Sequence, residues 1–143
     1  MYIIHNEISL LYFSDTDILE CTSGLIRTME SRSFHVMCLS FSSSPAATLH
    51  WQIQPWHQNQ TLQLVCSSDN HSCTSHPEVQ AHMFGNVDSD LTIPRVERGM
   101  FNSSTLTCSV TSRDKPDWSG SDSCLIDVTC KYISAQCVEA KIL

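Results

Sequence analysis

"CLSFSSSPAATLHW" (residues 38–51) decides the fold, because it places a cysteine and a tryptophan on either side of a turn-forming stretch. In SFHVMCLSF (33–41), every second residue shares one face with Cys38. In TLHWQIQ (48–54), Leu49, Trp51 and Ile53 share one face. Such alternation predicts two β-strands that each bury one face. Between them Pro45 removes a backbone hydrogen-bond donor, which predicts a break in the chain.

Similar short stretches follow down to residue 130, and turn residues separate them. Pro55 predicts the end of the strand over 48–54, while Pro94 predicts an edge position or a strand end. No stretch keeps a helical period for long. The further predicted strands cover 61–66, 79–84, 89–96, 104–110 and 124–130, and a polar loop is predicted over 112–121. This spacing predicts an all-β fold, an antiparallel β-sandwich.

Composition limits the classes of partner. The 143 residues suit one domain, and 41% apolar residues are enough for a core. With a formal net charge of -7 and eight scattered Lys and Arg residues, the chain lacks the clustered positive surface that phosphate binding needs. We therefore expect no nucleic-acid partner.

Cysteines and glycosylation sequons indicate the compartment. The chain has eight cysteines, and three N-x-S/T sequons begin at Asn59, Asn70 and Asn102. Together they predict a secreted protein or an ectodomain that is disulfide-bonded and N-glycosylated.

The first residues do not fit a secretory leader. MYIIHNEISLLYFSDTDILE (1–20) has no basic start, carries three acidic residues before residue 18 and lacks a small-residue cleavage site. We expect residues 1–19 to be an N-terminal extension, disordered or misassigned. No apolar run approaches the ~18 residues of a membrane span, so we expect no span in this chain.

Cys38, Trp51 and Cys108 form the most specific pattern in the chain. Each lies within a predicted strand, on the face where its neighbours are apolar. This pattern resembles the immunoglobulin superfamily, with HVMCLSF as strand B, LHWQIQ as strand C, DLTIPRV as strand E and STLTCSV as strand F. The resemblance covers residues 20–130 and leaves 131–143 as a linker or the truncated start of a further module.

The resemblance implies an immunoglobulin-like sandwich in which a Cys38–Cys108 disulfide joins the two sheets and Trp51 packs against it. It also identifies a departure from the family pattern. The family usually carries a tyrosine two residues before the second cysteine, and here that position is Leu106. Leu106 keeps the packing role in the core, but the hydroxyl that ties down the E–F corner is lost.

The other cysteines, at 21, 66, 73, 124, 130 and 137, allow many pairings. Strands A and G can lie side by side in this fold, which favours Cys21–Cys124. Cys66 and Cys73 flank a short loop, which suits a hairpin disulfide. Cys130 and Cys137 then pair locally or with a module outside this chain. This set resembles the immunoglobulin domains of invertebrate multi-domain recognition proteins, including molluscan fibrinogen-related lectins.

A zinc site is the alternative for CSSDNHSCTSH (66–76), with Cys66, His71, Cys73 and His76 as ligands. Zinc knuckles prefer two to four residues between their cysteines, and here six intervene. A glycan on Asn70 would also crowd the metal. We therefore expect a disulfide and no metal.

Catalysis is not indicated. The chain contains no G-x-S-x-G, no H-E-x-x-H and no glycine-rich phosphate loop, and it has only four glycines. We expect no enzymatic activity and no cofactor.

Ligand binding is expected at the loops FSSSPAA (41–47) and SRDKPDWSGS (112–121). In the second loop Trp118 lies among Arg113, Asp114, Lys115 and Asp117, and a tryptophan in a polar loop is a candidate hot spot. The alternative is that Trp118 folds back and packs on the sheet edge.

In the family, the C–C′ and E–F turns lie at the end opposite these loops. Glycans on Asn59 and Asn102 would cover that end, and Asn70 would lie on the side near strand C′. The sequence thus predicts an extracellular recognition or adhesion module, immune- or adhesion-related, that binds a protein or glycan and has possible homophilic contacts. The alternative is a structural spacer domain with no ligand of its own.

Overall fold

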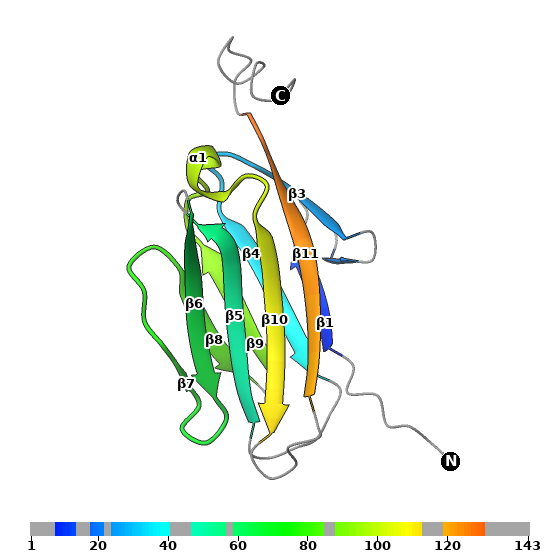
Figure 1. Ribbon diagram of the computed structural model, residues 1–143, viewed down its shortest axis with the longest axis vertical. Coiled ribbons are helices and arrows are strands. Elements are labelled where there is room, and N and C mark those ends of the chain that lie inside the picture. The colour runs from blue at the N-terminus through cyan, green and yellow to red at the C-terminus, as the bar shows by residue number, and fades with distance from the viewer. Residues whose placement is uncertain are drawn as a thin grey trace, which may run out of the picture.

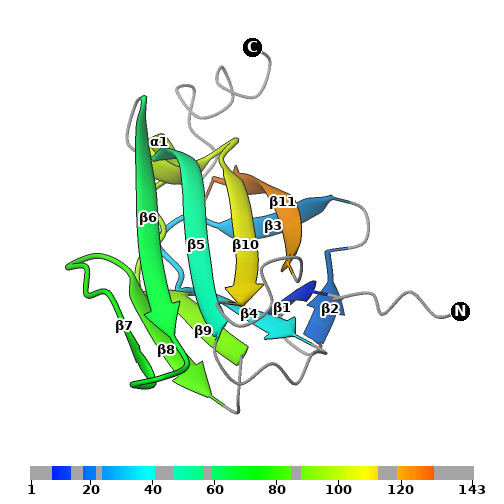
Figure 2. The same ribbon diagram turned by 60° about the horizontal axis from the view of Figure 1, so that its bottom comes forward.

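The protein is an immunoglobulin-like β-sandwich of two sheets packed face to face, as Figures 1 and 2 show. The computed structural model describes residues 8–13, 18–21, 24–40, 47–56, 59–84, 88–112 and 119–130. Within these ranges the only helix is one turn, α1 (Arg98–Phe101). The predicted all-β class is confirmed.

The first sheet has five strands. Their order is β2 (Ile18–Glu20), β1 (Ile8–Phe13), β4 (Phe34–Ser40), β9 (Asp88–Ile93) and β8 (Gln80–Phe84). All neighbours in this sheet are antiparallel. The strands β4, β9 and β8 take the places of strands B, E and D of an immunoglobulin domain.

The second sheet has six strands. Their order is β3 (Leu25–Met29), β11 (Ser119–Thr129), β10 (Thr105–Ser112), β5 (Ala47–Trp56), β6 (Gln60–Ser67) and β7 (Ser72–Cys73). Only β3 and β11 run parallel, and their pairing places an A-type strand beside strand G. The order β11, β10, β5, β6 corresponds to strands G, F, C and C′.

The core follows from strict alternation along β5 and β10. Ala47, Leu49, Trp51 and Ile53 point inward from β5, and each is at most 3% exposed. From β10 the inward positions include Leu106, which is fully buried at the position where the family carries tyrosine. Because side chains alternate between faces, every second residue of these strands is left for the outer surface.

The prediction that residues 1–19 form an extension outside the domain is wrong for Ile8–Phe13, and also for Ile18 and Leu19, which belong to β2. The segment Ile8–Phe13 is β1, which pairs with β4 so that Leu11 lies opposite Met37. Leu10 is only 1% exposed, and its N–H donates to Oδ2 of Asp122 on β11 at 2.9 Å. Strand pairing and burial therefore make this segment part of the sandwich.

Two predicted strand boundaries also differ from the observed ones. Pro55 does not end β5, because the strand continues through a shift in register between Ile53 and Trp56. Trp56 is buried, which accounts for the continuation of the strand past the proline. The last strand begins at Ser119 and not at Cys124. Residues 119–121, which were predicted to belong to the polar loop, are therefore part of β11. By contrast, β9 does end at Ile93, immediately before Pro94.

Candidate recognition surfaces

Three disulfides fix the sandwich. Cys38–Cys108 joins β4 to β10, and Cys21–Cys124 joins the end of β2 to β11, so both connect the two sheets. Cys66–Cys73 joins the neighbouring strands β6 and β7. Cys130 is also disulfide-bonded, and Cys137 lies outside the described residues.

The Cys66–Cys73 disulfide decides against the zinc alternative for this loop. Zinc binds cysteine as the thiolate, and both sulfurs are consumed by the covalent bond. His76 packs edge-on against Trp56 with ring centroids 6.2 Å apart, and its Nδ1 accepts a hydrogen bond from the N–H of Glu78 at 3.1 Å.

Trp51 lies in the centre of the core and has a polar partner. Its Nε1–H donates to Oγ of the buried Ser89 on β9 at 2.9 Å. The Ser89 hydroxyl in turn donates to the carbonyl of His82 at 2.7 Å. The indole nitrogen is therefore satisfied inside the sandwich and links its two sheets.

Other residues hold the turn before β10, where the resemblance to immunoglobulin domains implies a tyrosine and Leu106 stands instead. The hydroxyl of the buried Ser104 donates to the carbonyl of Pro55. Oδ1 of Asn102 accepts a hydrogen bond from the N–H of Val128 at 2.8 Å. Phe101 of α1 packs edge-on against Phe34 and Trp56, with centroid distances of 5.4 and 6.0 Å.

The three sequons lie at opposite ends of the molecule. Asn59 precedes β6 and Asn102 follows α1, at the upper end in Figure 1. Asn70 lies in the turn between β6 and β7 at the lower end, and Ser68 in the same turn donates its N–H to the carbonyl of Ala47, the first residue of β5. Asn59 and Asn70 are exposed, whereas Asn102 is half-buried. Asn70 thus lies at the edge of the sheet, as expected. It also lies at the lower end of the sandwich, where β4 and β10 finish.

The five residues of the predicted ligand-binding loop lie outside the described residues. They are Arg113, Asp114, Lys115, Asp117 and Trp118. The described strand ends, Ser112 and Ser119, place the two ends of this loop at the lower end of the sandwich in Figure 1.

The outer surface of the four central strands of the six-stranded sheet carries a single acidic side chain, Asp127 near the end of β11, and no Lys or Arg; the positions other than Asp127 are uncharged. We call these uncharged positions the uncharged face. Its members are Thr48, His50, Gln52, Gln54, Thr61, Gln63, Val65, Ser67, Thr105, Thr107, Ser109, Thr111, Ser119, Ser121, Ser123 and Leu125. Charged residues make up 16% of the chain and concentrate on surfaces, so their absence from these positions is a marked departure from its composition.

The register arranges these side chains in rows across the face. One central row contains Ser121, Ser109, His50 and Val65 on four adjacent strands. In the next row the hydroxyls of Thr107 and Ser123 are 2.9 Å apart. The face therefore offers short Ser and Thr hydroxyls, which lose little rotamer freedom on contact with a partner, together with longer Gln side chains, which lose more.

The two large hydrophobic side chains that are exposed among the described residues both belong to the uncharged face. Val65 is 40% exposed and Leu125 is 46% exposed. A charged pair, Arg27 and Asp127 at 3.8 Å, lies on β3 and β11 and borders the face on that side.

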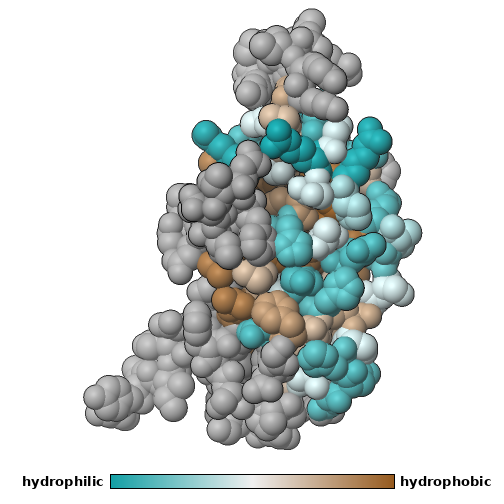
Figure 3. Space-filling view, turned by 180° about the vertical axis from the view of Figure 1, so that it is seen from behind, coloured by the Kyte–Doolittle hydropathy of each residue, from teal (hydrophilic) through white to brown (hydrophobic). Residues whose placement is uncertain are grey.

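The outer face of the five-stranded sheet is different in character. Figure 3 shows hydrophilic side chains over much of it and hydrophobic ones gathered beside the grey residues. It carries the pair His82–Asp90, with Nδ1 and Oδ1 3.4 Å apart, as well as the partly exposed Met37 and Leu39. Acidic groups and titratable pairs thus interrupt this face.

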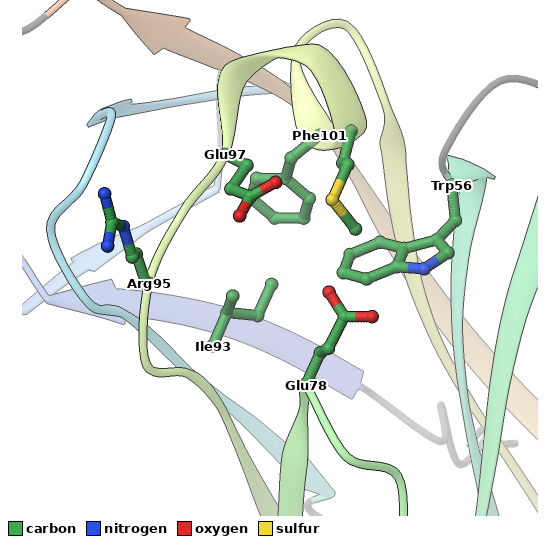
Figure 4. Close-up of a pocket in the computed structure, with 7 residues that line it drawn as sticks. Trp56, Glu78, Ile93, Arg95, Glu97 and Phe101 are labelled. Carbon is green, nitrogen blue, oxygen red and sulfur yellow. The ribbon is translucent and has the colours of Figure 1, made fainter.

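A small hollow lies at the α1 end of the sandwich, close to Trp56 (Figure 4). The residues around it come from three separate segments of the chain, namely the end of β5, the approach to β8 and residues 93–101. Sequence reasoning missed this hollow because no local pattern links these segments. The uncharged face was not predicted either, although most of its residues lie at alternate positions of four predicted strands.

The described part of the chain contains no helix with the length and apolar character needed to cross a membrane. Nor do three or more His, Cys, Asp or Glu side chains come together there in a way that could hold a metal ion.

Comparisons with known proteins identify the fold and not a family. No protein-family model and no curated protein matches the sequence. Among solved structures, 632 chains match. One belongs to a structure described as "Structural basis of T cell specificity and activation by the bacterial superantigen toxic shock syndrome toxin-1", with a TM-score of 0.62 over 87% of this chain and 99% of that chain. At 11% sequence identity, this likeness shows a shared β-sandwich fold alone.

Proposed function

We propose that this chain is an extracellular recognition module of the immunoglobulin superfamily that binds a protein partner through the uncharged face. The observation that carries the proposal is the scarcity of charge on a broad sheet surface, where Asp127 at one border is the one acidic side chain among the outward residues of the four strands, together with both large hydrophobic side chains that are exposed among the described residues. Depletion of charged residues is the compositional signature of the buried centre of protein interfaces. The proposed activity is binding, without catalysis.

Superfamily membership is supported by topology and by the core. The Cys38–Cys108 disulfide bridges the two sheets, Trp51 lies buried between them, and the strand order matches strands B, E, D and G, F, C, C′. An extracellular location is supported by the disulfides, because such bonds persist in oxidising compartments.

A protein partner is favoured over a glycan. Sugar-binding sites commonly stack a sugar ring on an aromatic side chain, and the uncharged face has no Trp, Tyr or Phe. A flat, extended surface suits a partner of similar size, since stable protein interfaces bury ≈ 800 Å² on each side. Electrostatics also matters for a chain with a formal net charge of -7, because a face with few charges adds little short-range repulsion against an acidic partner or a second copy.

Ser121→Arg tests the uncharged face. Ser121 is exposed in the central row, so arginine there adds a long charged side chain without touching the core. We expect binding to a cognate extracellular domain to weaken at least ~10-fold, the effect of about 1.4 kcal/mol. The measurement is surface plasmon resonance of the disulfide-intact chain, presented as a multivalent probe against a panel of extracellular domains, with its own copy included.

The matched control is Gln80→Arg, which adds the same charge at an exposed position of β8 in the other sheet. Binding should survive in this variant. Equal loss in both variants would refute the uncharged face as the docking surface. If the wild-type chain bound no member of the panel and no copy of itself, the spacer alternative would replace recognition.

The extracellular part of the proposal predicts N-glycans at Asn59 and Asn70. Both residues are exposed, so Asn59→Gln and Asn70→Gln should each remove one glycan and change stability by less than ~0.5 kcal/mol. Asn102→Gln should cost about 1 kcal/mol, because Asn102 accepts the hydrogen bond from the N–H of Val128. Intact mass spectrometry of the protein secreted by eukaryotic cells, with urea unfolding, checks both. An unmodified wild-type protein would contradict the glycoprotein assignment.

A further inference from the structure

The hollow beside Trp56, which we call the α1 hollow, is a surface depression of about 230 Å³, a volume that includes space open to solvent. It lies at the upper end of the sandwich in Figure 1, away from the uncharged face and from the strand ends that carry the predicted loops. Its apolar floor consists of Trp56, Ile93, Met100 and Phe101. Its rim carries Glu78, Arg95 and Glu97, all exposed.

The floor is held rigidly by ring packing. Phe101 contacts both Trp56 and Phe34 edge-on, and His76 contacts Trp56 from another side. Trp56 and Phe101 are 7% and 1% exposed, so the small part of their surface that remains accessible is fixed in place. The floor is therefore preformed, which lowers the entropic cost of filling it.

Two carboxylates stand over this floor on anchored backbone. Glu78 precedes the buried Val79, and its N–H donates to Nδ1 of His76 at 3.1 Å. Glu97 follows the buried Val96, and its carbonyl accepts the N–H of Met100 at 3.2 Å. Figure 4 shows the Glu78 carboxylate beside Trp56 and the Glu97 carboxylate close to the ring of Phe101, while the guanidinium of Arg95 extends away from the hollow.

Neither carboxylate forms a hydrogen bond or an ion pair with any residue in the described part of the chain. Two unpaired negative groups on opposite sides of one small apolar floor make a potential minimum for a positive charge. The formal net charge of -7 strengthens this attraction at longer range.

We propose that the α1 hollow binds a basic side chain, lysine or arginine, presented by a protein partner. Such side chains have an apolar stem and a cationic tip, which match the apolar floor and the two carboxylates. The hollow is shallow and open to solvent, so it contacts part of one side chain and does not enclose a drug-sized molecule. The α1 hollow and the uncharged face have no residue in common. Each proposal can therefore be refuted without affecting the other.

The test is a two-dimensional NMR titration of the full chain that follows the indole N–H of Trp56 and the methyl group of Met100. The probes are the Nα-acetyl methylamides of lysine and arginine, with norleucine as the uncharged probe of similar length. Half-saturation by the basic probes is expected on the order of 10 mM, which needs both carboxylates and the apolar floor together, because one exposed ion pair alone gives binding weaker than ~100 mM. Norleucine should bind at least ~5-fold more weakly, and added salt should weaken only the basic probes.

Variants separate the site from general charge attraction. Glu78→Gln combined with Glu97→Gln should weaken binding of both basic probes ~10-fold. Asp69→Asn in the β6–β7 turn removes one negative charge at the other end of the molecule and should leave binding unchanged. Circular dichroism checks that the variants fold, and the single Glu97→Gln variant, with an expected ~3-fold loss, replaces the double variant if that one does not.

Three results would overturn the inference. One is equal binding of norleucine and the basic probes, and another is unchanged binding by the folded Glu78→Gln/Glu97→Gln variant. The third is tighter binding of the Nα-acetyl methylamide of glutamate than of lysine, which would identify Arg95 as the main recognition group of the hollow.

Discussion

Replacing Cys38 and Cys108 together with alanine lowers the free energy of unfolding by about 4 kcal/mol, a large share of the ~5–15 kcal/mol that stabilises a domain. The bond closes a loop with a sequence separation of 70 and joins the two sheets through their centre. Without it the unfolded chain gains conformational freedom, which favours unfolding. Urea denaturation followed by tryptophan fluorescence, extrapolated to water, measures the loss.

Cys66→Ala with Cys73→Ala is the matched control. It removes a disulfide with a sequence separation of only 7, between neighbouring strands at the edge of one sheet. The same chain-entropy relation gives about 2 kcal/mol for so short a loop. A larger loss from the edge disulfide than from the central one would contradict the assignment of Cys38–Cys108 as the main covalent constraint.

Trp51→Ala is the second large effect, with an expected loss of about 3–5 kcal/mol. The indole is 1% exposed, and its removal opens a cavity between the sheets. Its hydrogen bond to Ser89, which links β5 to β9, is lost as well. Differential scanning calorimetry should record a clear fall in Tm, or a chain that no longer unfolds cooperatively.

Trp51→Phe separates packing from hydrogen bonding. Phenylalanine keeps most of the apolar volume but cannot donate to Ser89, whose hydroxyl still donates to the carbonyl of His82. The expected loss is about 1–2 kcal/mol, clearly smaller than for alanine. Equal losses in the two variants would mean that the hydrogen bond, and not the packed ring, dominates.

The core was predictable because its signals are local. Alternation around Cys38, Trp51 and Cys108 predicts three strands with one buried face each, and the family resemblance then implies which strands are neighbours. All three disulfide pairings between described residues agree with the expected ones. Leu106 was expected in the core and is fully buried.

The N-terminal strand was missed because its evidence is not local. ISLLYF is apolar on consecutive positions, so it shows no clean period of two, and signal-peptide criteria say nothing about strand pairing. Its place depends on β4 as a partner and on Asp122, which lies 112 residues away along the chain from Leu10. Such long-range contacts are invisible to a reading of short windows.

The turn before β10 is held by residues that the sequence did not single out for this role. The sequence shows Leu106 where the resemblance implies tyrosine, but it does not show which residues supply the polar contacts. Ser104 and Asn102 supply the polar ties, and Phe101 supplies the packing. Serine and asparagine are common in any loop, so their roles emerge only when Pro55 and Val128 are brought beside them.

The two proposed contact regions also differ in how far the sequence could predict them. Most of the uncharged face lies on outward positions of strands predicted from the sequence. Ser67, Thr111 and Ser123 lie just outside those strands, and Ser119 and Ser121 were assigned to a loop. Serine at alternate positions gives no hydrophobic signal, which explains that error. The α1 hollow needs the turn of backbone after Ile93 and the approach to β8 to meet beside Trp56, and this meeting is a property of the tertiary fold.

The first strand has a practical meaning for anyone dissecting this molecule. On one side β4 is covered by β9 and on the other by β1. A truncated chain that starts at Cys21 would leave the backbone N–H and C=O groups along one edge of β4 without partners. It would also expose the core residues that Leu10 covers. An unpaired edge strand of this kind can pair with strands of other molecules and cause aggregation. We therefore expect that a shortened chain that folds without aggregating must still include β1, beginning at Ile8.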